Sequence, residues 1–89
     1  MISLEYKIVE AFYLAREDFA EAGDFYSCKA IDLAADIAES FGSIGLAADD
    51  YFNVLINALQ YDIENTEHDE GRAGFVRALE LVSEIHRLA

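Results

Sequence analysis

The chain has no proline or tryptophan, a single cysteine, and only six lysines and arginines among its 89 residues. With Cys28 alone, no internal disulfide framework can form, which is compatible with a reducing compartment. No apolar run approaches the roughly 20 residues that a membrane-spanning helix needs. The first residues also lack the basic region and apolar run of a signal peptide. We therefore expect a cytoplasmic protein.

The shortage of basic residues leaves a large negative charge. Eighteen aspartates and glutamates give a net charge of −12 at pH 7, and nearly all of it lies in residues 1–70, since residues 71–89 hold two acids and three bases. Such a charge lowers folding stability by self-repulsion. It also repels nucleic acid and anionic lipid, so we expect no direct nucleic-acid binding and no membrane binding. A basic protein partner would compensate the charge.

Apolar residues make up 54% of the chain, which favours a folded core over disorder despite the charge. Because proline is absent, the five glycines supply the boundaries between segments. Apolar residues recur between them at spacings of three and four, which is typical of amphipathic helices. The sequence predicts one all-α domain over 1–89, a compact antiparallel bundle of about four helices at about 4–22, 24–41, 46–65 and 71–88.

Local signals sharpen the first two of these boundaries. Ser3 and Asp24 are expected to cap the N-termini of the first and second helices, because their side-chain oxygens can accept from free backbone N–H groups. Gly23 is expected to end the first helix. The buried stripe of the first helix is predicted to contain Ile8, Phe12, Ala15, Phe19 and Ala22.

The acid-rich stretch 62–70 does not have the ligand spacing of a known metal site. A calcium loop starting at Asp62 would need glycine where Glu67 stands and glutamate where Ala73 stands. Neither histidine follows a glutamate by three positions, as di-iron bundles require. No His-Glu-x-x-His zinc motif is present. We expect no metal and no other cofactor.

Catalytic arrangements are also missing. Cys28 lies in the first turns of a predicted helix, where the helix dipole would favour a thiolate. However, it shares an apolar arc with Ile31 and Ala35, and no histidine lies near it in the sequence, so we expect a small buried thiol. His86 is expected at the edge of the core. Paired carboxylates need a cleft between them, which a small bundle rarely provides. The chain is therefore not expected to be an enzyme.

The outer faces of the first three predicted helices carry acids with almost no lysine or arginine among them. Residues three or four apart lie about 4.5–6 Å apart along a helix, which is of the order of the phosphate rise of about 3.4 Å along a DNA strand. A tyrosine beside such acids supplies both apolar area and a hydrogen bond, as at binding hot spots. We predict a partner-binding surface formed by Glu10, Tyr13, Glu17, Glu21, Asp32, Asp36, Glu39, Asp49, Asp50 and Glu64.

This pattern favours a non-enzymatic acidic inhibitor, or decoy, that binds and blocks the basic nucleic-acid-binding surface of another protein. In size, charge and helicity it resembles small anti-defence proteins of phages and mobile elements, such as anti-CRISPR proteins, although no motif is shared. Two alternatives stay open. One is an immunity protein or antitoxin that neutralises a basic nuclease toxin. The other is a structural or adaptor helical subunit, with a homodimer as one form of it, because the second and third helices have wide apolar arcs.

Overall fold

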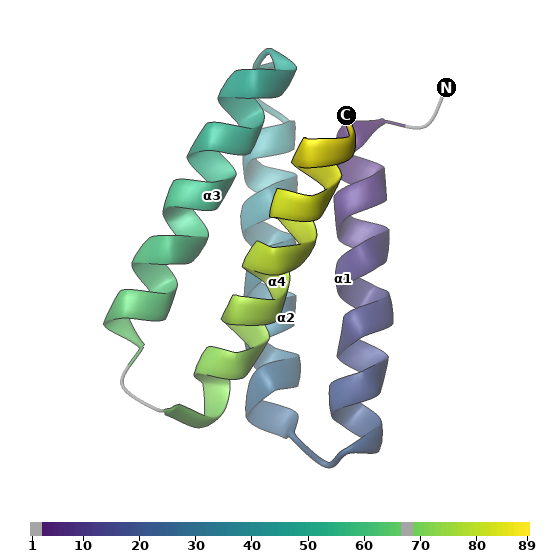
Figure 1. Cartoon of the computed structure of the whole chain (residues 1–89), viewed down its shortest axis with the longest axis vertical. Coiled ribbons are helices and arrows are strands. Elements are labelled where there is room, and N and C mark those ends of the chain that lie inside the picture. The colour runs from purple at the N-terminus through teal and green to yellow at the C-terminus, as the bar shows by residue number, and fades with distance from the viewer. Residues whose placement is uncertain (1–2, 67–68) are drawn as a thin grey trace.

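The order of the elements follows the amphipathic pattern of the sequence. The computed structural model describes residues 3–66 and 69–89, which form four α-helices and no strand (Figure 1). The chain descends in α1, rises in α2, descends in α3 and rises in α4, so successive helices are antiparallel (Figure 1). This confirms the predicted all-α bundle. The helices span Leu4–Glu21 (α1), Phe25–Gly42 (α2), Ala48–Asn65 (α3) and Asp69–Leu88 (α4).

The hairpin between α1 and α2 has the predicted caps. The Ser3 hydroxyl accepts from the Tyr6 N–H at 3.1 Å, and the Asp24 carboxylate accepts from the Ser27 N–H at 3.1 Å. Gly23 has a φ of +76°, in the left-handed region that favours glycine, and it separates the two helices. This tight connection places α2 directly against α1.

The helices α2 and α4 cross closely near their N-terminal ends. A Cβ atom on Gly74 would lie 2.5 Å from the carbonyl oxygen of Ser27 and 2.8 Å from the Cβ of Ala30, so only glycine allows this approach. The buried Ser27 hydroxyl lies 2.7 Å from the Asp24 carboxylate and 3.0 Å from the Glu70 carbonyl oxygen, which links the start of α2 to the start of α4. The helices α1 and α3 pack on either side of this pair (Figure 1).

The predicted apolar stripe of α1 lies in or against the core except at Ala22. Ala22 is exposed because α1 ends before it. On α2, Leu33 is 55% exposed. His86 lies at the edge of the core, as expected, and stacks on Phe52 with ring centroids 4.4 Å apart. The largest fully buried apolar side chains are Ile8, Phe12, Ile31, Phe52, Leu55, Leu59 and Val82.

Two helix starts differ from the prediction. The helix α3 begins at Ala48, two residues later than expected, and α4 begins at Asp69, two residues earlier. Both first turns hold two acids, which the positive end of the helix dipole stabilises. Gly71, taken as a boundary in the sequence, therefore lies inside α4. None of the helices in the described ranges is long and apolar enough to cross a membrane.

Candidate partner-binding surface

One side of α1 points away from the bundle and alternates tyrosine with glutamate. Positions 6, 10, 13 and 17 follow one another at spacings of four, three and four, which places them in one row along the helix. Tyr6, Tyr13 and Leu14 are 57%, 49% and 60% exposed. They belong to a shallow hollow of about 200 Å³. We call its lining the α1 face: Tyr6, Val9, Glu10, Tyr13, Leu14 and Glu17.

The α1 face continues onto α2. A neighbouring hollow is lined by Ser3, Glu5, Tyr6, Val9 and Glu39, so it shares Tyr6 and Val9 with the α1 face. Glu39 of α2 therefore extends the same surface. Glu21 is exposed one helical turn beyond Glu17. The structure thus brings Glu10, Tyr13, Glu17, Glu21 and Glu39 of the predicted set onto one side of the molecule.

Among the described residues, no lysine or arginine lines either of these two hollows. Arg16, although it belongs to α1, turns toward α2, where its Nε donates to an Asp32 carboxylate oxygen at 2.8 Å. This hydrogen bond and the Asp32 charge raise the pKa of the Arg16 guanidinium. The pair neutralises Asp32, which was predicted to offer a free charge to a partner.

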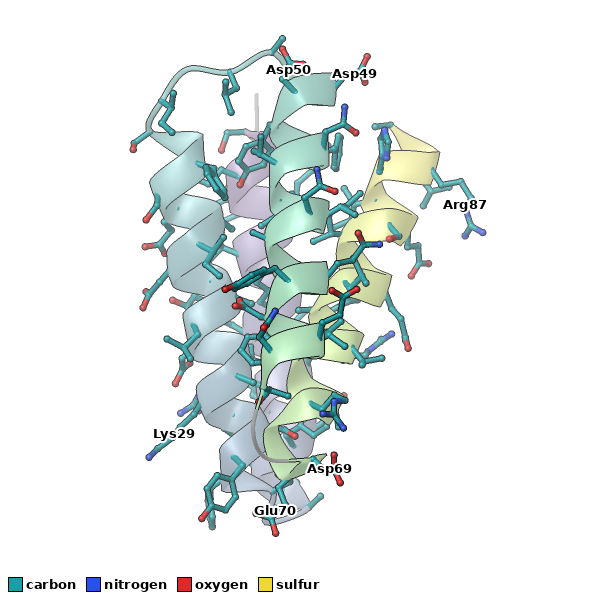
Figure 2. All side chains as sticks on the ribbon, turned by 90° about the vertical axis from the view of Figure 1, so that its left-hand side faces the viewer. Lys29, Asp49, Asp50, Asp69, Glu70 and Arg87 are labelled. Carbon is teal, nitrogen blue, oxygen red and sulfur yellow. The ribbon has the colours of Figure 1, made fainter. Side chains whose placement is uncertain are left out.

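The other predicted acids lie elsewhere. Asp36 lines a trough between α2 and α3. Asp49 and Asp50 occupy the first turn of α3, and Figure 2 places them at the opposite end of the bundle from Asp69 and Glu70.

Glu64 lies in the last turn of α3. A separation of fourteen residues places it about 21 Å along the helix from Asp50. Neither acid is among the described residues that line the α1 face or its neighbouring hollow.

Two apolar contributors to the α1 face were missing from the sequence prediction. Val9 is half-buried at the edge toward α2, and Leu14 is exposed. A helical projection contains the signal for Leu14, because two residues turn the helix by about 200° and so place it nearly opposite the buried Phe12. Glu5, which lines the adjoining hollow, was also missed.

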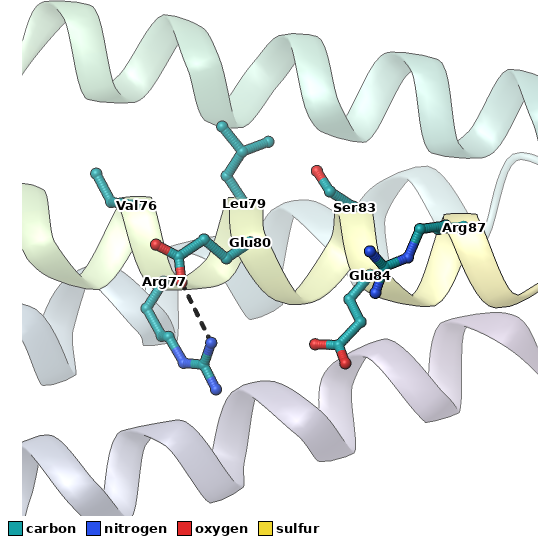
Figure 3. A pocket seen from close by; sticks show the side chains of 7 residues that line it. All are labelled: Val76, Arg77, Leu79, Glu80, Ser83, Glu84 and Arg87. Atoms are coloured by element: carbon teal, nitrogen blue, oxygen red, sulfur yellow. Dashed lines mark hydrogen bonds and ion pairs between the residues drawn. The ribbon is translucent and has the colours of Figure 1, made fainter.

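The outer side of α4 offers a larger hollow of about 630 Å³ with balanced charge. Figure 3 shows Arg77 beside Glu80, with its Nη1 3.3 Å from a Glu80 carboxylate oxygen, and Glu84 and Arg87 further along α4. With two glutamates and two arginines in its lining, this hollow has no charge preference for a basic partner.

Arg72 makes contacts that stabilise the connection between α3 and α4. It pairs with Asp69, and its Nε and Nη2 donate to the carbonyl oxygens of Ile63 at 3.3 Å and Thr66 at 3.4 Å. These carbonyls belong to the end of α3, so Arg72 joins the end of α3 to the start of α4. Neither Arg72 nor Arg77 compensates the acids of the α1 face.

Two potentially reactive side chains, those of Cys28 and Tyr51, are buried in the fold. Cys28 is 3% exposed, with its Sγ 3.6 Å from the Arg16 carbonyl oxygen, which confirms the predicted buried thiol. The Tyr51 hydroxyl donates to the Ala38 carbonyl oxygen at 2.7 Å, and burial together with the Glu5 charge raises the pKa of Tyr51 to about 12.

Within residues 3–66 and 69–89, no three histidine, cysteine, aspartate or glutamate side chains gather as metal ligands do. Glu67 and His68, which entered the metal-motif comparisons, lie outside the described residues. Comparison of the chain with protein-family models, curated proteins and solved structures finds no match. The surface described above therefore supplies the basis for a functional proposal.

Proposed function

We propose that the protein is a non-enzymatic acidic inhibitor that acts in the cytoplasm by occupying the basic nucleic-acid-binding surface of a partner protein. The observation that supports this most is the α1 face. It combines exposed tyrosine rings with glutamates, and Glu39 extends it onto α2. No lysine or arginine is among the described residues that line it. A surface of this kind complements a groove lined by lysine and arginine.

The spacing along α1 suits such a groove. Glu10 and Glu17 are seven residues apart, or about 10.5 Å along the helix. Three phosphate steps along one DNA strand cover about 10.2 Å. The carboxylates can therefore meet basic side chains that are arranged for phosphates three steps apart along one strand.

The tyrosines give the interface more than charge. Opposite charges steer association and raise its rate, whereas apolar contacts made after docking slow dissociation. Tyr6 and Tyr13 can bury their rings against the partner while each hydroxyl keeps a hydrogen bond. A charged surface without them would bind quickly and release quickly.

Charge also favours a different protein over a second copy of the chain. Two copies would each carry a net charge of −12 and would therefore repel one another. A basic partner gains from the same charge. Identifying the captured partner would distinguish a nuclease toxin from another nucleic-acid-binding protein.

Capture followed by competitive elution tests the proposal. The immobilised protein is exposed to a lysate at low salt, and bound proteins are eluted with a DNA or RNA oligonucleotide at unchanged ionic strength. We expect basic nucleic-acid-binding proteins to be retained and then released by the oligonucleotide. Retention of proteins without a basic nucleic-acid site, or bound partners that the oligonucleotide does not release, would contradict the proposal.

A pair of matched variants locates the contact. E10Q/E17Q removes two charges from the α1 face, and E80Q/E84Q removes two charges from the balanced side of α4. We expect the first variant to lose at least tenfold in affinity for the captured partner and the second to change it by less than about twofold, as for a peripheral charge pair. Equal effects would show a diffuse charge attraction in place of a defined surface.

A further inference from the structure

A second anionic surface lies on another side of the bundle, in the seam between α2 and α3 that faces the viewer in Figure 2. The seam contains a trough of about 360 Å³, a volume within the range of about 300–1,000 Å³ for ligand pockets. Its lining is mainly apolar, with carboxylates from both helices. The side chains that matter are Leu33, Ile37 and Phe41 of α2, Phe75 of α4, and the carboxylates of Asp36 and Asp62.

The contents of the trough are unusual for a solvated groove. Leu33 leaves 55% of its surface exposed in a trough that two acids also line. The three ion pairs among the described residues include neither Asp36 nor Asp62. Burial raises the pKa of Asp62, so its ionised form is poorly solvated in the seam. A cation placed there would relieve that cost.

The shape of the trough and the mixture of apolar and acidic side chains in its lining favour one kind of cation. A long aliphatic stem can pack on Leu33, Ile37 and Phe75 while a charged head reaches the two carboxylates that line the trough. Arginine fits this arrangement best, because its planar guanidinium carries five donors that can serve two carboxylates, and it is less strongly hydrated than an ammonium group. Small inorganic cations would use the carboxylates and leave the apolar lining unused.

We infer that the trough between α2 and α3 is a binding site for an arginine side chain presented by a basic protein. The source of that arginine rests on the proposed function: it belongs to the same partner that meets the α1 face. The outer side of α2, with Asp32 and Glu39, lies between the two surfaces, so a partner that spans α2 reaches both.

The site can be tested without the partner by using N-butylguanidinium, which has the stem and head of arginine. The full-length protein, labelled at its methyl groups, is titrated with this probe and followed by NMR. We expect saturable shifts at the methyl groups of Leu33 and Ile37. N-butylurea has the same stem and a neutral planar head. We expect it to bind with an apparent affinity at least fivefold lower than that of N-butylguanidinium.

Isosteric variants separate the site from general charge attraction. We expect D36N and D62N each to weaken N-butylguanidinium binding at least fivefold, while D50N, which removes the same charge from the exposed first turn of α3, leaves it unchanged. Equal binding of N-butylurea, or shifts spread over all acidic faces, would overturn the inference. So would an equal loss in D50N.

The two proposals can fail separately. If N-butylguanidinium binds in the trough but no captured partner yields to nucleic acid, the proposed function is wrong and the cation site stands. If partners are captured and displaced but the trough does not bind the probe, the inhibitor proposal stands and the arginine site is wrong. E10Q/E17Q serves as a further check, because it should leave N-butylguanidinium binding unchanged.

Discussion

At the scale of single residues, Asp62 links a candidate binding site to stability. Burial raises the pKa of its carboxyl in the folded state, so the folded chain holds this proton more tightly than the unfolded chain does. The contribution of Asp62 to stability is therefore fully present below the unfolded pKa of about 3.9. It is lost as the pH rises through the raised folded value. Near neutral pH the ionised side chain opposes folding.

Replacing Asp62 removes this cost. We expect D62N to be more stable than the unsubstituted protein at pH 7, with the difference disappearing below about pH 3.5. Urea unfolding of both proteins at several pH values measures the difference in free energy of unfolding. A variant that is less stable at every pH would show that the carboxylate makes a favourable contact, which would contradict the account of the trough given above.

The hydroxyl group of Tyr51 stabilises the fold through a buried hydrogen bond. Its O–H donates to the Ala38 carbonyl oxygen at 2.7 Å within the core. We expect Y51F to lower the free energy of unfolding by about 1 kcal/mol, the usual net value of such a hydrogen bond. Y61F provides the control, because Tyr61 is 65% exposed and its replacement should change stability by less than about 0.5 kcal/mol. Equal losses in denaturant unfolding would contradict this assignment.

At the scale of helices, the sequence predicted what local chemistry determines. Ser3, Gly23 and Asp24 act within a few residues of themselves, and the predicted caps and turn are present. Periodicity also sufficed for Glu10 and Tyr13, because residues on one helix keep their relative positions in any bundle. The predicted acids on that side of α1 are accordingly exposed together.

Features that depend on how helices lie against one another could not be predicted. The pairing of Arg16 with Asp32 and the extension of the α1 face to Glu39 both require the register between α1 and α2. Gly74 was read as a boundary, whereas it permits the close crossing with Ser27. Apolar periodicity identifies the side of a helix that is buried but does not identify the helix that covers it.

Two glycines of α4 give a direct test of that crossing. A Cβ at position 74 would press on the backbone and Cβ of α2, so G74A should destabilise the protein by about 1–3 kcal/mol, as overpacking does. At Gly71 the nearest atom to an added Cβ is the Tyr26 carbonyl oxygen at 3.7 Å, an ordinary contact. G71A should therefore raise stability by up to about 1 kcal/mol through helix propensity. Chemical denaturation measures both, and the opposite order would disprove the crossing.

At the scale of the whole molecule, uncompensated charge is the dominant property. The net charge is −12, and the ion pairs in the described ranges engage Asp32, Asp69 and Glu80. The acids of the α1 face and of the trough therefore repel one another in the unbound protein. That repulsion is a cost in stability which a basic partner would remove.

Salt should reduce this cost. Raising NaCl from 20 to 200 mM shortens the screening length and should increase the melting temperature. A gain of 1 kcal/mol would correspond to about 4–8 °C for a domain of this size. E10Q/E17Q should melt higher than the unsubstituted protein at low salt and respond less to NaCl. A melting temperature indifferent to salt would show that the charges are already well separated.

Competition for a purified partner tests the proposed function most directly. A fluorescently labelled nucleic acid is bound to the partner, and its anisotropy is followed as this protein is added. We expect complete, stoichiometric release of the nucleic acid, with E10Q/E17Q requiring at least tenfold more protein and E80Q/E84Q behaving as the unsubstituted protein does. A stable ternary complex, in which the nucleic acid and this protein bind the partner together, would contradict the proposal.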